Sequence, residues 1–197
     1  MKPWSEACER NREPILGVLK QWFTAPGTVL EIGSGTGQHA VFMAEHLPHV
    51  VWQATDREEN LDGIRQWFAA AGLANLPAPI SLDVRDSPWP IAAADYVFSA
   101  NTAHIMSWPE VEALFNGIGA TLRSGGAFCL YGPFNRDGQF TSASNQAFDA
   151  MLRARDPAMG LRDDQALIAL GREANLDFSA EYPLPANNRM LVWVKRR

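Results

Sequence analysis

Short apolar runs alternate along this chain with segments in which apolar residues recur every three or four positions. The short runs are bounded by Gly, Pro or acidic residues and predict buried strands at residues 28–32, 49–55, 94–100 and 127–131, with a further strand ending near 82–84. The longer segments predict helices at residues 5–23, 38–47, 57–71 and 108–122. Strands that alternate with helices form a mostly parallel sheet with helices on both faces.

The last third of the chain departs from this alternation. Residues 132–144 are polar and longer than a minimal connection, which is typical of a functional loop. Further helices are predicted at residues 144–155 and 163–175, and further strands at 178–182 and 189–195. Because only a short loop joins these last two strands, we expect them to be antiparallel.

The first helix precedes this alternating pattern. Pro14 lies inside it, and we predict a break or kink there because proline lacks an N–H group and clashes with the preceding turn. No repeat or linker interrupts the chain. We therefore expect one domain over residues 1–197, with residues 1–26 forming an N-terminal helical extension over a ligand site.

A glycine loop, residues 31–37 (EIGSGTG), connects the first predicted strand to the next helix. Glycines let the backbone turn sharply and let a ligand approach closely. The spacing is G-x-G-x-G, not the dinucleotide pattern G-x-G-x-x-G. Glu31 would repel a pyrophosphate but suits a ligand that carries an ammonium and a sulfonium group. Asp56 ends the second strand, where an acid binds a ribose in related folds.

This loop resembles the first motif, [DE]-x-G-x-G-x-G, of the class I S-adenosylmethionine-dependent methyltransferases. The resemblance implies a Rossmann-like three-layer sandwich, with a seven-stranded, mostly parallel sheet and an antiparallel C-terminal strand. It also implies S-adenosyl-L-methionine as cofactor and S-adenosyl-L-homocysteine as product.

The positions that match the family's cofactor site are Glu31, Gly33, Gly35, Gly37, Asp56, Asp83, Val84 and Ala100. By resemblance, the glycines approach the methionine and ribose portions, Glu31 orients the loop near the amino acid portion, and Asp56 accepts hydrogen bonds from both ribose hydroxyls. Asp83 would bind the adenine amine, with Asp86 as a nearby competitor, and Val84 would supply a backbone N–H.

Nearly the whole chain is also similar to a narrower group, the methyltransferase-like 26 proteins and their bacterial relatives of unknown function. The matching segments are 9–16 (ERNREPIL), 29–39 (VLEIGSGTGQH), 100–105 (ANTAHI), 130–134 (LYGPF) and 185–188 (PANN). This resemblance implies the fold and the cofactor but no substrate.

The candidates for catalysis follow the fourth strand. His104 is the best candidate for a general base, because an unperturbed histidine titrates near neutral pH. Asn101 is a candidate for orienting a substrate or the cofactor amine. A structural role is the alternative for both residues.

Other candidates come from the end of the fifth predicted strand and from the first predicted helix. Tyr131 and Phe134 are expected to shape a substrate pocket, with core packing as the alternative. Asn11 and Arg12 are expected at the cofactor, where Arg12 would pair with the methionine carboxylate. A surface position is the alternative for Arg12.

Composition narrows the function. The formal net charge of −5 argues against nucleic acid as a partner and favours a small-molecule substrate. Two cysteines, the lack of an apolar signal segment and the lack of a membrane-length apolar run predict a cytoplasmic protein without disulfides. No Cys/His cluster has zinc spacing, so we expect no metal. The oligomeric state stays open.

The leading hypothesis is therefore methyl transfer from S-adenosylmethionine to an unidentified small molecule. The alternative is a catalytically silent module that binds the same cofactor as a sensor or partner subunit. A nicotinamide oxidoreductase is a third hypothesis, which Glu31 and the position of Gln38 disfavour.

Overall fold

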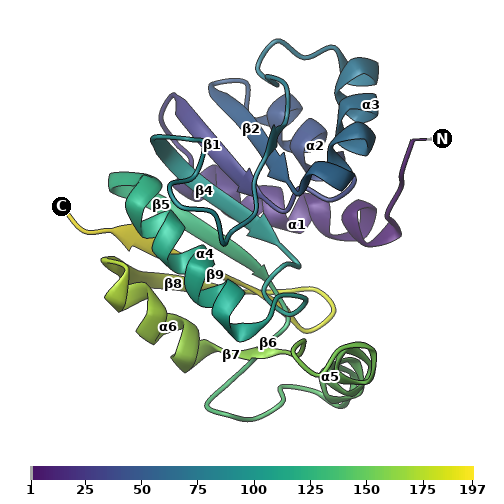
Figure 1. The fold of residues 1–197 in the computed structure, drawn as a ribbon, viewed down its shortest axis with the longest axis vertical. Helices are drawn as coiled ribbons and strands as arrows, with labels where there is room; N and C mark the ends of the chain where they lie inside the picture. The colour runs from purple at the N-terminus through teal and green to yellow at the C-terminus, as the bar shows by residue number, and fades with distance from the viewer. Residues whose placement is uncertain (1) are drawn as a thin grey trace.

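The computed structural model describes residues 2–197 and contains a seven-stranded sheet in the order β3-β2-β1-β4-β5-β9-β8 (Figure 1). The strands are β1 (Gly27–Ile32), β2 (Val50–Asp56), β3 (Ile80–Ser81), β4 (Ala94–Ala100), β5 (Leu122–Gly132), β8 (Leu176–Leu184) and β9 (Asn188–Lys195). Neighbours among β1 to β5 are parallel, and β9 is antiparallel to both β5 and β8. The predicted sheet is confirmed.

Helices cover both faces of this sheet. They are α1 (Glu6–Trp22), α2 (Gln38–His46), α3 (Leu61–Ala71), α4 (Trp108–Thr121), α5 (Ala143–Arg155) and α6 (Asp164–Glu173), with a 3-10 turn η1 (Glu58–Asn60) before α3. Buried residues of α1, α2 and α3 share one core with the sheet, and those of α4 and α6 share the other. Helix α5 lies beside a two-stranded sheet made of β6 (Phe134–Asn135) and β7 (Arg162–Asp163) (Figure 1).

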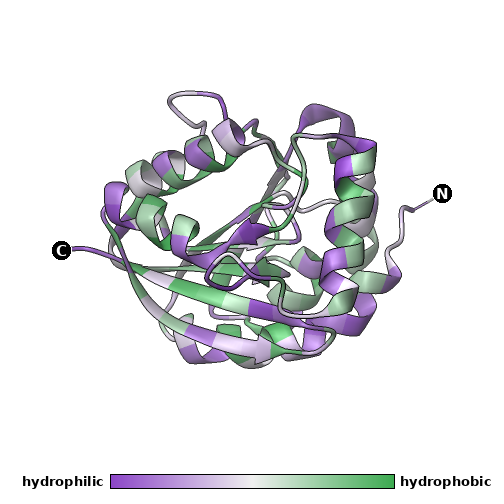
Figure 2. Ribbon diagram, turned by 90° about the horizontal axis from the view of Figure 1, so that it is seen from below, coloured by the Kyte–Doolittle hydropathy of each residue, from purple (hydrophilic) through white to green (hydrophobic). Residues whose placement is uncertain are grey.

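The two cores follow from the alternation of side chains along the central strands. In β5, Cys129 and Tyr131 face the first core, and Phe128 and Leu130 face the second. Figure 2 shows hydrophobic central strands between helices whose outer faces carry hydrophilic residues. Because both faces of the sheet are covered, its central strands are apolar on both sides, as in other parallel sheets.

The predicted break at Pro14 is wrong, because α1 runs unbroken through this residue. Ile15, Leu16 and Leu19 of the same helix are buried against the sheet. Burying each such side chain contributes about 1.5–3 kcal/mol, which together exceeds the cost of about 3 kcal/mol for one internal proline.

Several strand boundaries also differ from the prediction, among them those of β3 and β5. β3 ends at Ser81 instead of near 82–84, because the chain turns at Asp83, whose carbonyl accepts from the Asp86 N–H at 3.0 Å. The fifth strand was predicted to begin at residue 127, but β5 and its pairing with β4 already begin at Leu122.

Candidate ligand-binding site

Two cavities open at the carboxyl ends of β1, β2 and β4, where parallel sheets commonly bind ligands. The smaller cavity has a volume of about 350 Å³ and the larger cavity about 1110 Å³. Gly33, Gly35, Ala100 and Asn101 line both of them. The two cavities are therefore adjacent, and one ligand can reach from one into the other past these four residues.

The glycine loop forms this shared wall with a backbone in which all three of its glycines have positive φ angles. A Cβ atom on Gly33 (φ 72°) would come within 2.5 Å of Thr102 Cγ2, so only glycine fits there. A Cβ on Gly35 (φ 57°) would meet no protein atom within 4 Å and would project into open space. Gly37 caps α2 against Ile64 and is not a lining residue of either cavity.

Glu31 lies beneath the loop, 2% exposed. Its Oε2 atom accepts hydrogen bonds from Ser34 Oγ at 2.8 Å and from Trp52 Nε1 at 3.0 Å. Burial raises the pKa of this carboxyl to about 7, against the opposing effect of the two donors. Because Glu31 lines neither cavity, it acts on the loop from inside through Ser34.

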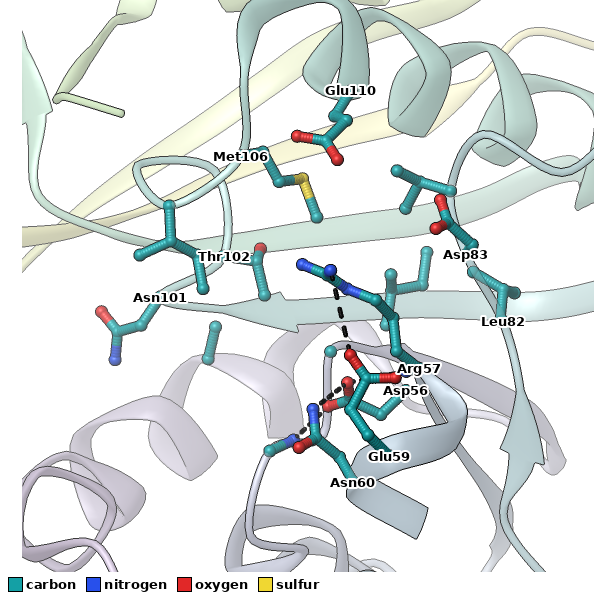
Figure 3. A pocket seen from close by; sticks show the side chains of 16 residues that line it. Asp56, Arg57, Glu59, Asn60, Leu82, Asp83, Asn101, Thr102, Met106 and Glu110 are labelled. Atoms are coloured by element: carbon teal, nitrogen blue, oxygen red, sulfur yellow. Dashed lines mark hydrogen bonds and ion pairs between the residues drawn. The ribbon is translucent and has the colours of Figure 1, made fainter. Parts of the chain in front are cut away.

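Asp56 ends β2 and faces the smaller cavity (Figure 3). Its Oδ2 accepts from the Gly35 N–H at 2.7 Å, and its Oδ1 accepts from Asn60 Nδ2 and the Arg57 N–H, each at 2.8 Å. A carboxylate offers about four acceptor sites, so this one can still take donors from a ligand. Asp56 therefore couples the glycine loop to the cavity.

The far side of the smaller cavity comes from the segment after β3. Asp83 and Val84, two residues predicted to contact a cofactor, both line it. The Asp83 carboxylate binds the Arg85 guanidinium at 2.6 and 2.9 Å, and this hydrogen bonding lowers the pKa of Asp83 to about 2. Asp83 is therefore an ionised acceptor that is already shared with Arg85.

Several lining residues of the smaller cavity were not selected from the sequence. They are Arg57, Glu59, Asn60, Leu82, Ile105, Met106 and Glu110 (Figure 3). Glu110 lies in the first turn of α4, and the others follow the carboxyl ends of β2, β3 and β4 within six residues, but no motif marks any of them. Leu82, Ile105 and Met106 give this cavity an apolar part beside its carboxylates.

His104 and Asn101, the candidates for catalysis, both line the larger cavity. The imidazole of His104 is 7% exposed and packs edge-on against the Phe148 ring, with centroids 5.2 Å apart. Burial, and then the nearby Arg162 cation, lower the pKa of His104 to about 4. His104 is therefore neutral at physiological pH and has a ring nitrogen able to accept a proton.

Asn101 joins the two cavities in a strained conformation. Its φ is 59°, a region that asparagine tolerates better than most residues, and its N–H donates to the Tyr131 carbonyl at 2.9 Å. Strain of this kind concentrates at functional sites. The turn directs the chain from β4 toward His104.

Only some of the remaining predicted site residues lie at the larger cavity. Tyr131 and Asn11 line it, and Asn11 Oδ1 lies 2.7 Å from His39 Nε2. Phe134 lines neither cavity, because this residue is 2% exposed and belongs to the second core. Pro133 and Phe148 line the larger cavity instead.

Arg12 also lies away from both cavities. Its guanidinium pairs with Glu9 at 2.7 Å and covers the Phe42 ring at 4.7 Å. Arg10, two residues earlier on α1, lines the larger cavity and pairs with Glu6 at 2.8 Å. Of these two arginines of α1, Arg10 therefore lines a cavity and Arg12 does not.

Residues 2–197 contain neither a metal-binding cluster nor a membrane-spanning helix. No cluster of three or more His, Cys, Asp or Glu side chains has a geometry that would hold a metal ion. No helix in this range combines the length and apolar character that a membrane span requires.

A family model described as "Protein of unknown function (DUF938)" matches residues 2–195. Among curated proteins, the O-methyltransferase pgmB of Aspergillus terreus is 28% identical over 102 residues, which cover 51% of this chain and 28% of that protein. The match to this relative is therefore local.

Solved methyltransferase structures share the fold. An O-methyltransferase family protein from Burkholderia thailandensis superposes with a TM-score of 0.83 at 18% identity, covering 97% of this chain and 58% of that one. Human N-acetylserotonin methyltransferase, solved in complex with SAM, gives 0.77 at 17% identity, covering 98% and 53%. The YcgJ protein from Bacillus subtilis gives 0.75 at 15% identity and is covered over 99% of its length.

These likenesses establish the class I methyltransferase fold over nearly the whole chain. This chain spans little more than half of the two longer structures and about a quarter of the fungal relative.

Proposed function

The chain belongs to the family described as "Protein of unknown function (DUF938)", and we propose that it transfers a methyl group from S-adenosylmethionine to a hydroxyl oxygen of a small molecule. The observation that carries this proposal is the wall of Gly33, Gly35, Ala100 and Asn101 shared by the two cavities. The cofactor and the acceptor would therefore occupy adjoining sites that meet at these four residues.

The smaller cavity suits the adenosine portion of the cofactor. Asp56 offers carboxylate oxygens to a ribose diol, Asp83 offers an acceptor to an exocyclic amine, and Leu82 and Met106 offer apolar contacts to a flat ring. The open space at Gly35, which a Cβ would fill, admits a ligand close to the backbone. The residues present therefore fit this cofactor.

The larger cavity suits the acceptor. Its ionisable lining side chains are Cys8, Arg10, His39, His104 and Tyr131, so it contains no carboxylate that would repel an electron-rich oxygen. When bound, S-adenosylmethionine supplies an electrophilic methyl group. Neutral His104 would accept the proton that a hydroxyl loses, and Asn101 would orient the reacting groups where the cavities meet.

The names of several relatives support an oxygen acceptor. The fungal relative and the Burkholderia thailandensis structure are both described as O-methyltransferases. We therefore favour hydroxyl groups over nitrogen or carbon acceptors, and small molecules over proteins or nucleic acid.

Turnover tests the proposal directly. The full chain would be incubated with S-adenosylmethionine and a panel of small phenols, alcohols and hydroxy acids, with S-adenosylhomocysteine measured by mass spectrometry. We expect production that depends on one class of hydroxyl compound. His104→Gln should reduce this turnover about 100-fold, the usual contribution of a general base, and should leave cofactor affinity unchanged.

His46→Gln is the matched control, because His46 is exposed on α2 and lines neither cavity. It should retain full turnover. Failure of S-adenosylmethionine to bind at high micromolar concentration would refute the proposal. Tight binding without turnover on any acceptor would favour the silent cofactor-binding module.

A further inference from the structure

Arg162 is a buried cation that the proposed reaction does not use. Arg162 lies in β7 and is 9% exposed, and its hydrogen-bond partners are backbone carbonyls. Nε donates to Ala103 O at 3.0 Å, and Nη2 donates to Ala158 O at 2.8 Å and to Met106 O. In the part of the chain that the structure describes, no carboxylate pairs with this guanidinium.

Two of these carbonyls flank His104 in the chain. The 103–106 segment follows β4 and closes a short turn in which the Ile105 and Met106 N–H groups donate to Thr102 O at 3.0 and 3.2 Å. A third link comes from Gly160, whose N–H donates to the His104 carbonyl at 3.0 Å. Residues 158–162 therefore hold the backbone of His104 before, at and after this residue.

The charge of Arg162 acts on the same side chain. The charged group of β7 that lies near His104 is Arg162. Asp149 and Arg153 of α5 lie close enough to Arg162 to act on its charge. The other ionisable groups that line the larger cavity with His104 are Cys8, Arg10, His39 and Tyr131. Of all these groups, Arg162 is the charge that acts on His104.

A buried cation is costly unless other groups compensate it. Here the compensating groups are the carbonyls that set the position of one histidine. A neutral apolar side chain would pack in this place without the cost of burying a charge. The arrangement is therefore better explained by control of the His104 segment than by packing alone.

We propose that Arg162 is a positioning residue for His104. Its planar guanidinium donates to the carbonyls of Ala103 and Met106 and so fixes the 103–106 segment with the imidazole facing the larger cavity. The catalytic benefit rests on the proposed function, because it requires His104 to act as a base in methyl transfer.

The test uses three variants of the full chain. Arg162→Met removes the charge and the hydrogen bonds, and Arg162→Lys keeps the charge but loses the fork that reaches several carbonyls. Arg153→Met is the matched control, because it removes a guanidinium on neighbouring α5 that binds Asp149 and has no bond to the 103–106 segment. Thermal unfolding would establish that each variant is folded.

The first readout is the NMR titration of the His104 ring, assigned against His104→Gln among the four histidines. In the wild type we expect a midpoint near its pKa of about 4. Arg162→Met should raise the midpoint by about one pH unit, the effect of losing a nearby like charge. Arg162→Lys and Arg153→Met should leave it near the wild-type value.

The second readout is hydrogen exchange of the Ile105 and Met106 amides. Loss of the guanidinium fork should speed their exchange about tenfold in both Arg162 variants but not in Arg153→Met, since hydrogen bonds to charged groups contribute about 1.5–3 kcal/mol. A folded Arg162→Met protein in which both the His104 midpoint and these exchange rates are unchanged would overturn the proposal.

These readouts need no acceptor, so they separate this proposal from the proposed function. S-adenosylmethionine affinity, measured by calorimetry, should stay within about threefold of wild type in the Arg162 variants. If the cofactor does not bind the wild type, the proposed function fails, while the titration and exchange data still decide whether Arg162 positions His104.

Discussion

Asp56 is the single side chain on which cofactor affinity should depend most. Its carboxylate accepts from the Gly35 N–H at 2.7 Å and lines the smaller cavity. Asp56→Asn removes the charge and half of the acceptor capacity. Since hydrogen bonds to a charged group contribute about 1.5–3 kcal/mol, we expect the dissociation constant for S-adenosylmethionine to rise about 10- to 100-fold in calorimetry.

Asp62→Asn is the control for this change. Asp62 lies on α3, its side chain is 88% exposed, and its partner is Arg65 on the same helix. Cofactor affinity should stay within about twofold of wild type in this variant. A folded Asp56→Asn protein that binds as tightly as wild type would contradict the assignment of Asp56 to the cofactor.

Glu31 should make stability depend on pH in an unusual direction. Burial raises its pKa from the ordinary 4.5 to about 7. Below the ordinary value the carboxyl is protonated in both the folded and the unfolded chain. Between the two values the unfolded chain releases its proton first, so the free energy of unfolding falls with rising pH by up to about 1.4 kcal/mol per pH unit.

Glu31→Gln isolates this contribution because the amide stays neutral and can still accept from Ser34 and Trp52. Relative to wild type, the variant should gain about 2–3 kcal/mol of unfolding free energy between about pH 4.5 and 7.5, measured in urea without ligand. Glu45→Gln, at an exposed position of α2, should show no such gain. An equal difference from wild type at both ends of this range would exclude a raised pKa at Glu31.

At the residue scale, the sequence located the site best where the signal is local. Asp56 ends an apolar strand that follows a glycine loop, and both features stand within one stretch of chain. The prediction that Arg12 lies at the ligand site was wrong because α1 buries more than one face. Arg10 and Arg12 lie about 200° apart around the helix, and only the packing of α1 decides which of them meets the cavity. Periodicity alone does not predict which of the two arginines faces the cavity.

At the scale of elements, the hairpin between β8 and β9 carries measurable strain. Ala186 and Asn187 have φ angles of 60° and 57°, and the turn lines the larger cavity. Asparagine tolerates this conformation, but alanine does not. Ala186→Gly should therefore raise the free energy of unfolding by about 0.5–1 kcal/mol in urea denaturation.

Ala180→Gly provides the opposite control within the same strand pair. Ala180 lies in β8 in extended backbone, where glycine costs about 0.5–1 kcal/mol relative to alanine. The two substitutions should therefore change stability in opposite directions. Destabilisation by both would show that the turn at Ala186 is not strained.

Elements were predictable where periodicity and burial agree. β4 matches the predicted 94–100 strand residue for residue, because it is a buried apolar run with acidic and polar residues at its ends. The β6–β7 pair was missed, since two-residue strands depend on pairing between Phe134 and Arg162, which are far apart in sequence. That pairing also turns Phe134 into the core, where strand alternation gave no guidance.

At the scale of the whole molecule, the site joins the two halves of the sheet. The smaller cavity draws on the segments after β1, β2, β3 and β4, and the larger cavity adds α1, α5 and the β8–β9 hairpin. The topology predicted from the sequence places the glycine loop beside β4, but it does not fix how α5 and the hairpin close over His104. The acceptor side was therefore less predictable than the cofactor side.

Because the cofactor would contact both halves, binding should stabilise the entire fold. At about 100 times its dissociation constant, S-adenosylmethionine should add about 2.7 kcal/mol to the free energy of unfolding. For a chain of this size, that raises Tm by about 5–10 °C. Calorimetric scans should show one transition that shifts as a unit. His104→Gln should retain the shift, whereas Asp56→Asn should lose about half of it or more at the same ligand concentration.

NAD is the discriminating ligand in these scans. Its pyrophosphate would meet a loop with G-x-G-x-G spacing in place of the dinucleotide pattern. NAD should therefore leave Tm within about 1 °C of the ligand-free protein at a concentration where S-adenosylmethionine shifts it fully. A larger shift with NAD than with S-adenosylmethionine would contradict the proposed methyl transfer and favour an oxidoreductase. Both ligands would use Asp56, but we expect only S-adenosylmethionine to fit the residues that the two cavities share.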